Sequence, residues 1–322
     1  IKEYFEGSFE YFAEMVFEMK GTNRSNFSLV TGLEGMTVKL PLPFFKEQKE
    51  STEFKINIDF DDDKEVVVLS YADHNLFLTM QEKEITNGAI ALSGSLPLKN
   101  LPHDRGIVMG RMQSMNLVDY LDFISDSKSL GIPWELRDLQ ISQVKFRDLA
   151  LQEVTANGKL GSLSTKVEIQ SRGVDGVIEI EKAGNINVDL GRLNFSVFGQ
   201  TSYAEKLPNN FVEDYLGNLP NMTFNVDLLS FDDQDLGSVS FVLRNEQSKL
   251  EFYPFSFDVK GIVSEDAYMR WDLIRNYTAF NGGLFIEELD STLKAWDYQP
   301  SIISESTDIA ADFAWEGTLF DF

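Results

Sequence analysis

The 322-residue sequence contains no cysteine and only two histidines, and each shortage narrows the chemistry available to the chain. Without thiols, disulfides, thiolate metal sites and cysteine nucleophiles are excluded. His74 and His103 lack partners at the spacing of HxH, HxxxH or HExxH, so a structural or surface role is predicted for both. We therefore expect no metal and no cofactor.

Positive charge is also scarce. Against 28 Lys and Arg the chain has 52 Asp and Glu, which gives a formal net charge of −24 at pH 7. Such an acidic surface repels nucleic acid over most of its area, so we expect no nucleic-acid partner. The stretch "DFDDDKE" (59–65) begins like a calcium loop, but Lys64 stands where that loop needs glycine. A solvated turn is predicted there.

Long hydrophobic runs are absent as well. No stretch approaches the roughly 20 apolar residues that span a bilayer, and the first residues do not resemble a signal peptide. We expect the chain to be an excised soluble segment of a longer protein, either internal or C-terminal. Hydrophobic residues still make up 43% of the sequence and aromatic residues 12%, which is enough for a sizeable core.

Alternation of apolar and polar residues recurs from end to end, and it is typical of strands with one buried and one wet face. In "STKVEIQSRGVDGVIEIE" (Ser164 to Glu181), Val167 and Ile169 alternate before a glycine-marked bend. Ile178 and Ile180 alternate after it. About 15 to 18 such strands are predicted, a density typical of a sandwich, a barrel or a long rolled sheet.

Two segments depart from this alternation in the same way, each reading as a strand that runs into a short amphipathic helix. Their apolar residues repeat at spacings of four and three, which is typical of one helix face. They are Leu117, Leu121 and Ile124 in the first helix and Leu289, Leu293 and Trp296 in the second. We predict that these helices either cover the sheet and complete its core, or gate a groove beside it.

No catalytic motif stands out. The sequence lacks GxSxG, a P-loop and GxGxxG, and no motif pairs a nucleophilic residue with a general base. The chain is therefore predicted not to be an enzyme. Two other classes stay open: an interaction or scaffold protein with a dry sandwich core, and a carbohydrate-active β protein with a pair of acidic residues.

A series of seven motifs runs in order along the chain. The first is "GLEGMTVKLPLPFFKEQKESTEFKI", which contains Gly35, Leu40, Pro41, Pro43 and Lys46. There follow in order "VMGRMQSMNLVDYLDFI", "LRDLQISQVKFRDLALQEVTANG", "LGRLNF", "LPNMTFNVDLLSFDDQDLGSVSFVLR", "LDSTLKAWDY" and "ADFAWEGTLFDF". Each motif is weak alone, but together and in order they cover nearly the whole chain. The series resembles the YhdP family of AsmA-like bacterial envelope proteins, and the five residues named in the first motif agree with the family pattern.

The resemblance implies a segment of a bridge-like lipid transfer protein. Its fold would be all-β, with a long antiparallel, strongly curved sheet rolled into an elongated apolar groove and two short amphipathic helices. The polar stretch between Gly199 and Pro220, which does not alternate and contains Pro208, is the best internal boundary. The predicted division is a first groove segment at 1–200, a linker at 201–220 and a second segment at 221–322, continuous with the first. Glycerophospholipid would travel along this groove between the inner and outer membranes.

The resemblance also implies a place and partners. The full-length protein would be anchored in the inner membrane and lie in the periplasm of a Gram-negative bacterium. Its partners would be glycerophospholipid acyl chains, both membranes through regions outside this segment, and other envelope proteins. The predicted lining is the set of apolar residues that alternate on the strands: Val167, Ile169, Ile178, Ile180, Ile186, Val188, Phe195, Phe224, Val226, Val239, Phe241, Phe255 and Phe257.

Overall fold

The described part of the chain is built mainly of strands. In the computed structural model the described residues are 4–17, 24–61, 63–96, 101–117, 119–120, 131–146, 149–161, 164–182, 184–198, 220–232, 234–246 and 248–317. Strands account for 67% of the structure, and eighteen of them belong to one large curved sheet. The predicted all-β class is therefore confirmed. Contacts divide the chain into two compact units, residues 1–172 and 173–322.

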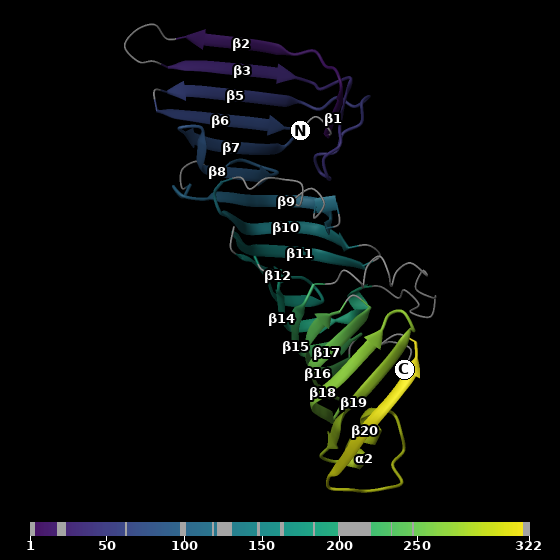
Figure 1. The fold of residues 1–322 in the computed structure, drawn as a ribbon. Helices are drawn as coiled ribbons and strands as arrows, with labels where there is room; N and C mark the ends of the chain where they lie inside the picture. The colour runs from purple at the N-terminus through teal and green to yellow at the C-terminus, as the bar shows by residue number, and fades with distance from the viewer. Residues whose placement is uncertain are drawn as a thin grey trace. The chain divides into compact units, whose positions relative to one another are not determined.

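The first unit contains the strands from β2 to β12 of the large sheet. They are β2 (Phe12–Phe17), β3 (Ser25–Thr31), β5 (Phe54–Asp61), β6 (Lys64–Tyr71), β7 (His74–Gln81), β8 (Glu84–Leu92), β9 (Gly106–Asn116), β10 (Trp134–Phe146), β11 (Leu149–Leu160) and β12 (Ser164–Gln170). Each strand pairs with the next in chain order, as Figure 1 shows. Within the described residues β2 has β3 as its one partner, so β2 is an edge strand.

The second unit contains the remaining strands of the sheet. They are β13 (Val174–Glu181), β14 (Ile186–Asn194), β15 (Met222–Phe231), β16 (Gln234–Asn245), β17 (Lys249–Val259), β18 (Ile262–Asp272), β19 (Tyr277–Ile286) and β20 (Thr307–Glu316). They too pair in chain order, and among the described strands β20 pairs with β19 alone. The sheet is therefore open at β20 as well as at β2.

Alternation in the sequence accounts for these strands. In β5, Ile56, Ile58 and Phe60 are half-buried, whereas Asn57 and Asp59 between them are exposed. Successive side chains of a strand point to opposite faces, so this pattern gives the sheet one apolar and one polar face.

Most strand pairs are antiparallel, as predicted, but three are parallel. β9 is parallel to both β8 and β10, and β15 is parallel to β14. A parallel pair needs a crossover that returns the chain to the same end of the sheet. Along the sequence, residues 93–105 separate β8 from β9, residues 117–133 separate β9 from β10, and residues 195–221 separate β14 from β15.

The division between the units falls at Arg172 and Gly173, inside the predicted first segment of 1–200. The predicted linker, 201–220, lies outside the described residues except for Pro220. It connects β14 to β15, which pair with each other inside the second unit.

One predicted helix lies fully within the described residues. It is α2 (Leu289–Ala295), which connects β19 to β20. Its buried Thr292 packs on the turn between β17 and β18, where a Cβ added to Gly261 would lie 2.7 Å from the Thr292 hydroxyl oxygen. In the other helix Leu117 has helical backbone, while Leu121 and Ile124 lie outside the described residues.

Candidate functional site

Apolar side chains form rows that run across the strands of the first unit. Directly opposed residues on neighbouring strands point to the same face of a sheet. One row, read through the pairing from β2 to β12, is Ala13, Leu29, Ile56, Leu69, Leu76, Ile90, Val108, Leu136, Gly158 and Val167. A second row is Met15, Phe27, Ile58, Val67, Leu78 and Gly88. We call the surface that these rows form the inner face of the first unit.

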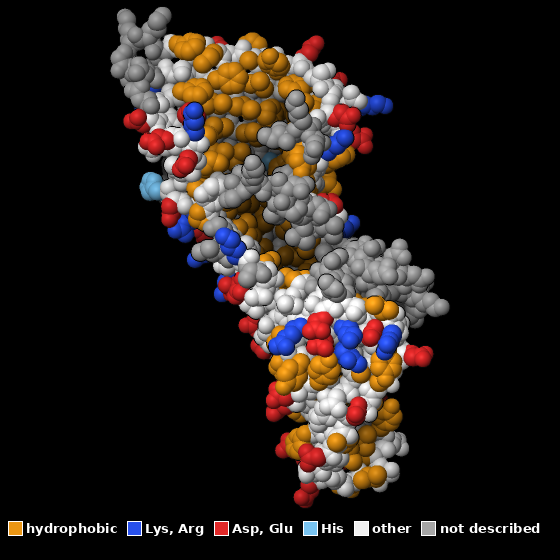
Figure 2. All heavy atoms as spheres, viewed as in Figure 1, with side chains coloured by type: hydrophobic (Ala, Val, Ile, Leu, Met, Phe, Trp, Pro, Cys, Tyr) orange, Lys and Arg blue, Asp and Glu red, His pale blue; other side chains and the backbone are white. Residues whose placement is uncertain are grey.

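Much of this inner face is open to solvent. Phe27, Ile58, Val67 and Leu78 are half-buried, and Met15 on the edge strand is 50% exposed. Figure 2 shows hydrophobic side chains gathered over the hollowed surface of the first unit, between rims that carry charged side chains. An exposed apolar surface of this extent, rimmed by polar groups, is typical of a binding surface.

A tryptophan occupies part of the second row. Gly88 pairs with Gly106 and Gly106 with Trp134, so the three residues share the inner face. A Cβ on Gly106 would lie 2.2 Å from the Trp134 ring, and a Cβ on Gly88 would lie 3.1 Å from it. The indole therefore lies flat over the backbone at Gly106, a position that requires glycine.

The second unit has an inner face of the same construction. One row is Ile178, Val188, Phe224, Phe241, Phe255 and Ala267, and another is Gly176, Leu190, Val226, Val239, Phe257 and Ser264. A third row is Ile180, Ile186, Met222, Leu243, Phe252, Met269, Phe280 and Phe313. None of these rows contains a charged residue.

Phenylalanine rings pack against one another on this face. Phe224 stacks on Phe241, with ring centroids 4.9 Å apart. The Phe241 ring also lies edge-on to Phe252 at 5.3 Å and is tilted against Phe255 at 6.3 Å. Such aromatic pairs contribute about 0.5–1.5 kcal/mol each beyond their buried area. Phe241 is therefore central to the inner face of the second unit.

The structure brings together most of the residues nominated from the sequence. Ten of them lie in the rows of the second unit: Ile178, Ile180, Ile186, Val188, Phe224, Val226, Val239, Phe241, Phe255 and Phe257. Val167 and Ile169 lie on the inner face of the first unit, opposite Gly158 and Ala156. Their contact with lipid stays a prediction.

Phe195 departs from the pattern. β14 ends at Asn194, and Phe195 begins the short 3₁₀ helix η3 (Phe195–Phe198), where side chains no longer alternate between two faces. The sequence alone continues the alternation through Leu193 and Phe195, so it predicts a longer strand. Phe195 is accordingly absent from the rows of paired residues.

The nominated residues also differ in exposure. Ile180 is 40% exposed and Val226 only 2% exposed, while the other nominated strand residues are half-buried. Val226 is therefore part of the packed base of the face, and the residues that a ligand could touch are the half-buried and exposed ones.

Sequence reasoning did not nominate the inner face of the first unit beyond Val167 and Ile169. Phe27 and Ile58 are half-buried on strands that show the same alternation, so the signal was present there as well. Val67 and Leu78 are also half-buried, but they lie in the continuous apolar runs 66–69 and 76–78, whose sequence does not indicate which residues share the inner face.

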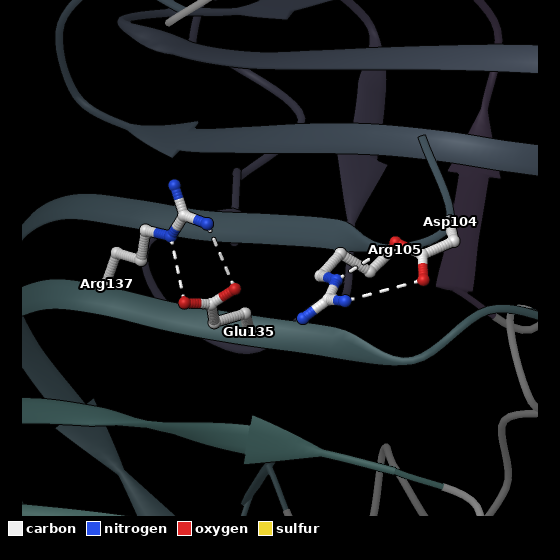
Figure 3. Close-up of polar contacts among 4 residues, drawn as sticks. All are labelled: Asp104, Arg105, Glu135 and Arg137. Carbon is white, nitrogen blue, oxygen red and sulfur yellow. Dashed lines mark hydrogen bonds and ion pairs between the residues drawn. The ribbon is translucent and has the colours of Figure 1, made fainter. Parts of the chain in front are cut away.

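The opposite, outer face carries charged side chains. Glu135 of β10 is paired with Ile107 and Lys159, on the face opposite Leu136. Arg137 donates two hydrogen bonds of 3.0 Å to the Glu135 carboxylate (Figure 3). These hydrogen bonds are the main reason that the pKa of Glu135 is lowered from its ordinary value.

A second ion pair lies close to this one. The Arg105 guanidinium donates bonds of 3.1 and 3.4 Å to the carboxylate of the adjacent Asp104 (Figure 3). Its hydrogen bonds and charge lower the pKa of Asp104. The sheet of the first unit therefore separates an apolar inner face from an outer face with paired charges.

The second predicted helix lies at the strand ends of its unit. Leu289 and Leu293 are half-buried, and Trp296 is 40% exposed. The Lys260 ammonium lies 5.4 Å from the centroid of the Trp296 ring, beside the turn that Thr292 contacts. This arrangement allows the helix to cover the end of the sheet, whereas its role as a gate stays a prediction.

Within the described ranges, no group of three or more His, Asp or Glu side chains is placed to hold a metal ion. Nor do these residues include a helix with the length and apolar character needed to cross a membrane.

The fold and the inner faces define a class: an all-β protein in which one large curved sheet presents an apolar face in each unit. The family model described as YhdP protein matches residues 1–322, so the chain belongs to the YhdP family. No curated protein matches the sequence.

Proposed function

We propose that the chain is a segment of a bridge-like lipid transfer protein that moves glycerophospholipids between the inner and outer membranes. One observation carries the proposal: each unit has uninterrupted rows of apolar residues on one face of its sheet, and many of them are half-buried. Family membership supports it, since YhdP proteins belong to the bacterial envelope.

The energetics favour acyl chains as the ligand. Burying a methylene group contributes about 0.8 kcal/mol, so a chain lying along these rows gains several kcal/mol without any directional contact. Because the gain depends on apolar area alone, the lipid can shift from strand to strand at little cost. Polar headgroups would remain at the rims, where the strand ends and the turns between strands carry residues such as Asp61, Lys64 and Glu82.

This function needs no covalent step and no cofactor, so the segment would act by sequestering lipid rather than as an enzyme. Its surroundings would be the periplasm, with membrane contacts made by other regions of the full-length protein. Envelope proteins would supply further partners.

Native mass spectrometry of the purified segment, followed by lipid extraction, tests the proposal directly. We expect glycerophospholipid at a reproducible ratio to protein. A protein that is folded but free of phospholipid would favour an interaction protein without cargo, and specific retention of an oligosaccharide would favour a carbohydrate-active protein.

A matched pair of variants ties the bound lipid to the inner face. Ile180→Lys places an ammonium group on the inner face at a position that is 40% exposed, so the chain should still fold. Asn187→Lys adds the same charge on the outer face, in the strand next to it. Bound phospholipid should fall several-fold in the first variant only; equal loss in both would argue against this face.

A further inference from the structure

A loop lies over one end of the inner face of the first unit, and its base is held firmly. It follows β4 (Met36–Val38), which pairs with β1 (Phe5–Gly7) in a small two-stranded sheet. We call residues 39–46 the overlying loop. At its base Val38 and Lys46 exchange backbone hydrogen bonds of 2.9 and 3.0 Å.

The Lys46 side chain strengthens this base. Lys46 is only 1% exposed, and its ammonium group donates hydrogen bonds to the carbonyl oxygens of Met36 at 2.8 Å and Glu47 at 2.9 Å. A buried ammonium group satisfied by backbone carbonyls holds both sides of the loop base together.

Two tyrosines hold the tip of the loop. The Tyr71 hydroxyl donates to the carbonyl of Phe44 at 3.0 Å, and the Tyr120 hydroxyl donates to the carbonyl of Leu42 at 2.7 Å. Burial raises the pKa of both tyrosines, so both hydroxyls stay protonated and able to donate at neutral pH. The loop is thus fixed at its tip as well as at its base.

The Phe44 ring extends across several strands beneath the loop. Its centroid lies 6.2 Å from that of Tyr71 on β6 and 5.2 Å from that of His74 on β7. The same side chain packs against a buried cluster that includes Leu92 of β8 and Met112 of β9. Phe44 therefore packs over β6 and β7 and against the buried cluster to which Leu92 and Met112 belong, at one end of the inner face.

Burial changes along these strands as the loop is approached. Tyr71 and His74 are each 9% exposed, and Leu92 is 6% exposed. On the same face of the same strands, Val67 and Leu78 are half-buried. The overlying loop therefore covers one side of the inner face and leaves the other side open.

We propose that the overlying loop is a fixed wall that sets the width of the lipid-binding surface in the first unit. It keeps the end of the face beneath Phe44 dry and confines acyl chains to the part that contains Val67 and Leu78. This inference rests on the proposed lipid function. Because base and tip are both anchored, the loop acts as a wall rather than as a lid that opens.

Contact between lipid and protein can be measured without disturbing the packed residues. The deuterated segment, labelled at its Leu and Val methyl groups, is loaded with protonated phosphatidylethanolamine, and isotope-filtered NOEs from acyl protons to methyl groups are recorded. In the wild-type protein we expect NOEs to Leu78 and none to Leu92. NOEs of equal strength to both methyl groups would overturn the wall.

Two phenylalanines of the loop form a matched pair for the second step. Phe44→Ala removes the ring over the covered end, and Phe45→Ala removes a ring that is 46% exposed on the same loop. NOEs to Leu92 should appear in Phe44→Ala and remain absent in Phe45→Ala. If Phe44→Ala leaves Leu92 without NOEs while Leu78 keeps them, the loop does not limit access.

A milder variant covers the case in which Phe44→Ala disturbs folding. Tyr71→Phe combined with Tyr120→Phe keeps both rings but removes the hydroxyls that hold the tip, and it should also bring NOEs to Leu92. No gain at Leu92 in this folded variant would likewise contradict the wall. If acyl NOEs are missing from Leu78 and also from Val239 of the second unit in every variant, the lipid function itself fails.

Discussion

The apolar inner faces of the two units are covered by different kinds of side-chain packing. In the first unit the rows are mainly aliphatic, and a separate loop covers one end through Phe44. In the second unit phenylalanine rings fill the face by packing against one another around Phe241. Both faces come from the same alternation on paired strands. The comparison indicates that the open apolar area is limited by the overlying loop in the first unit and by the bulk of the phenylalanine side chains in the second.

This difference predicts which residues carry stability. In the second unit Phe241→Ala should lower the free energy of unfolding by about 3 kcal/mol, because it removes a large ring together with its aromatic contacts. In the first unit Val67→Ala removes two methyl groups from a half-buried aliphatic side chain and should cost about 1 kcal/mol. Urea unfolding, with hydrogen exchange to report on each unit, measures both. Equal losses would mean that the rings add nothing to the packing of the second face.

Tyr120 gives an effect of intermediate size in the first unit. Tyr120→Phe removes the hydrogen bond to Leu42 and should cost about 1 kcal/mol. Burial, followed by the negative charge of Asp119, raises the pKa of Tyr120 from 10.0 to about 12. The stabilisation is therefore complete below pH 10 and is lost as pH rises toward 12, because the unfolded chain releases its proton first.

The pH dependence gives a control for this variant. Between pH 10 and about pH 12, stability should fall more steeply in the wild-type protein than in Tyr120→Phe. Tyr268→Phe alters a tyrosine of the second unit whose pKa is also raised, and it should leave the loop unaffected. Parallel curves for the wild-type protein and Tyr120→Phe would contradict the raised pKa of Tyr120 in the folded state, and coincident curves would show that its hydroxyl does not stabilise the fold.

Alternation made the strand faces predictable, because the direction of a side chain in a strand depends only on its position along the chain. That is why Phe224, Val239 and Phe257 could be placed together from the sequence. Alternation is the same in parallel and antiparallel strands, so it could not reveal that β9 and β15 are parallel to their neighbours. The 3₁₀ turn at Phe195 was hidden for a similar reason, since its residues continue the apolar pattern.

The covered end of the first inner face depends on contacts that no local pattern records. The proline-rich stretch around Leu42 and Phe44 indicates irregular backbone, but its position is determined by Tyr71 and Tyr120. These tyrosines lie 27 and 78 residues along the chain from the carbonyls that they bind. The signal available in the sequence was the family motif whose agreeing residues include Pro41, Pro43 and Lys46, and it carries no information on what the loop touches.

The smallest expected effect lies on the outer face, where neither loop nor rings act. Arg137→Gln breaks the ion pair with Glu135. Because the Arg137 side chain is 43% exposed and the Glu135 side chain is 24% exposed, the free energy of unfolding should fall by no more than about 1 kcal/mol. The pKa of Glu135 is lowered from 4.5, so this contribution is present above pH 4.5 and disappears as pH falls through the lower pKa of the folded state. The difference in stability between wild type and Arg137→Gln should therefore shrink on acidification and with added salt.

The same variant tests whether the two faces are independent. Lipid binding should not change in Arg137→Gln, because the sheet separates this ion pair from the inner face. A loss of bound phospholipid would show that the two faces are coupled.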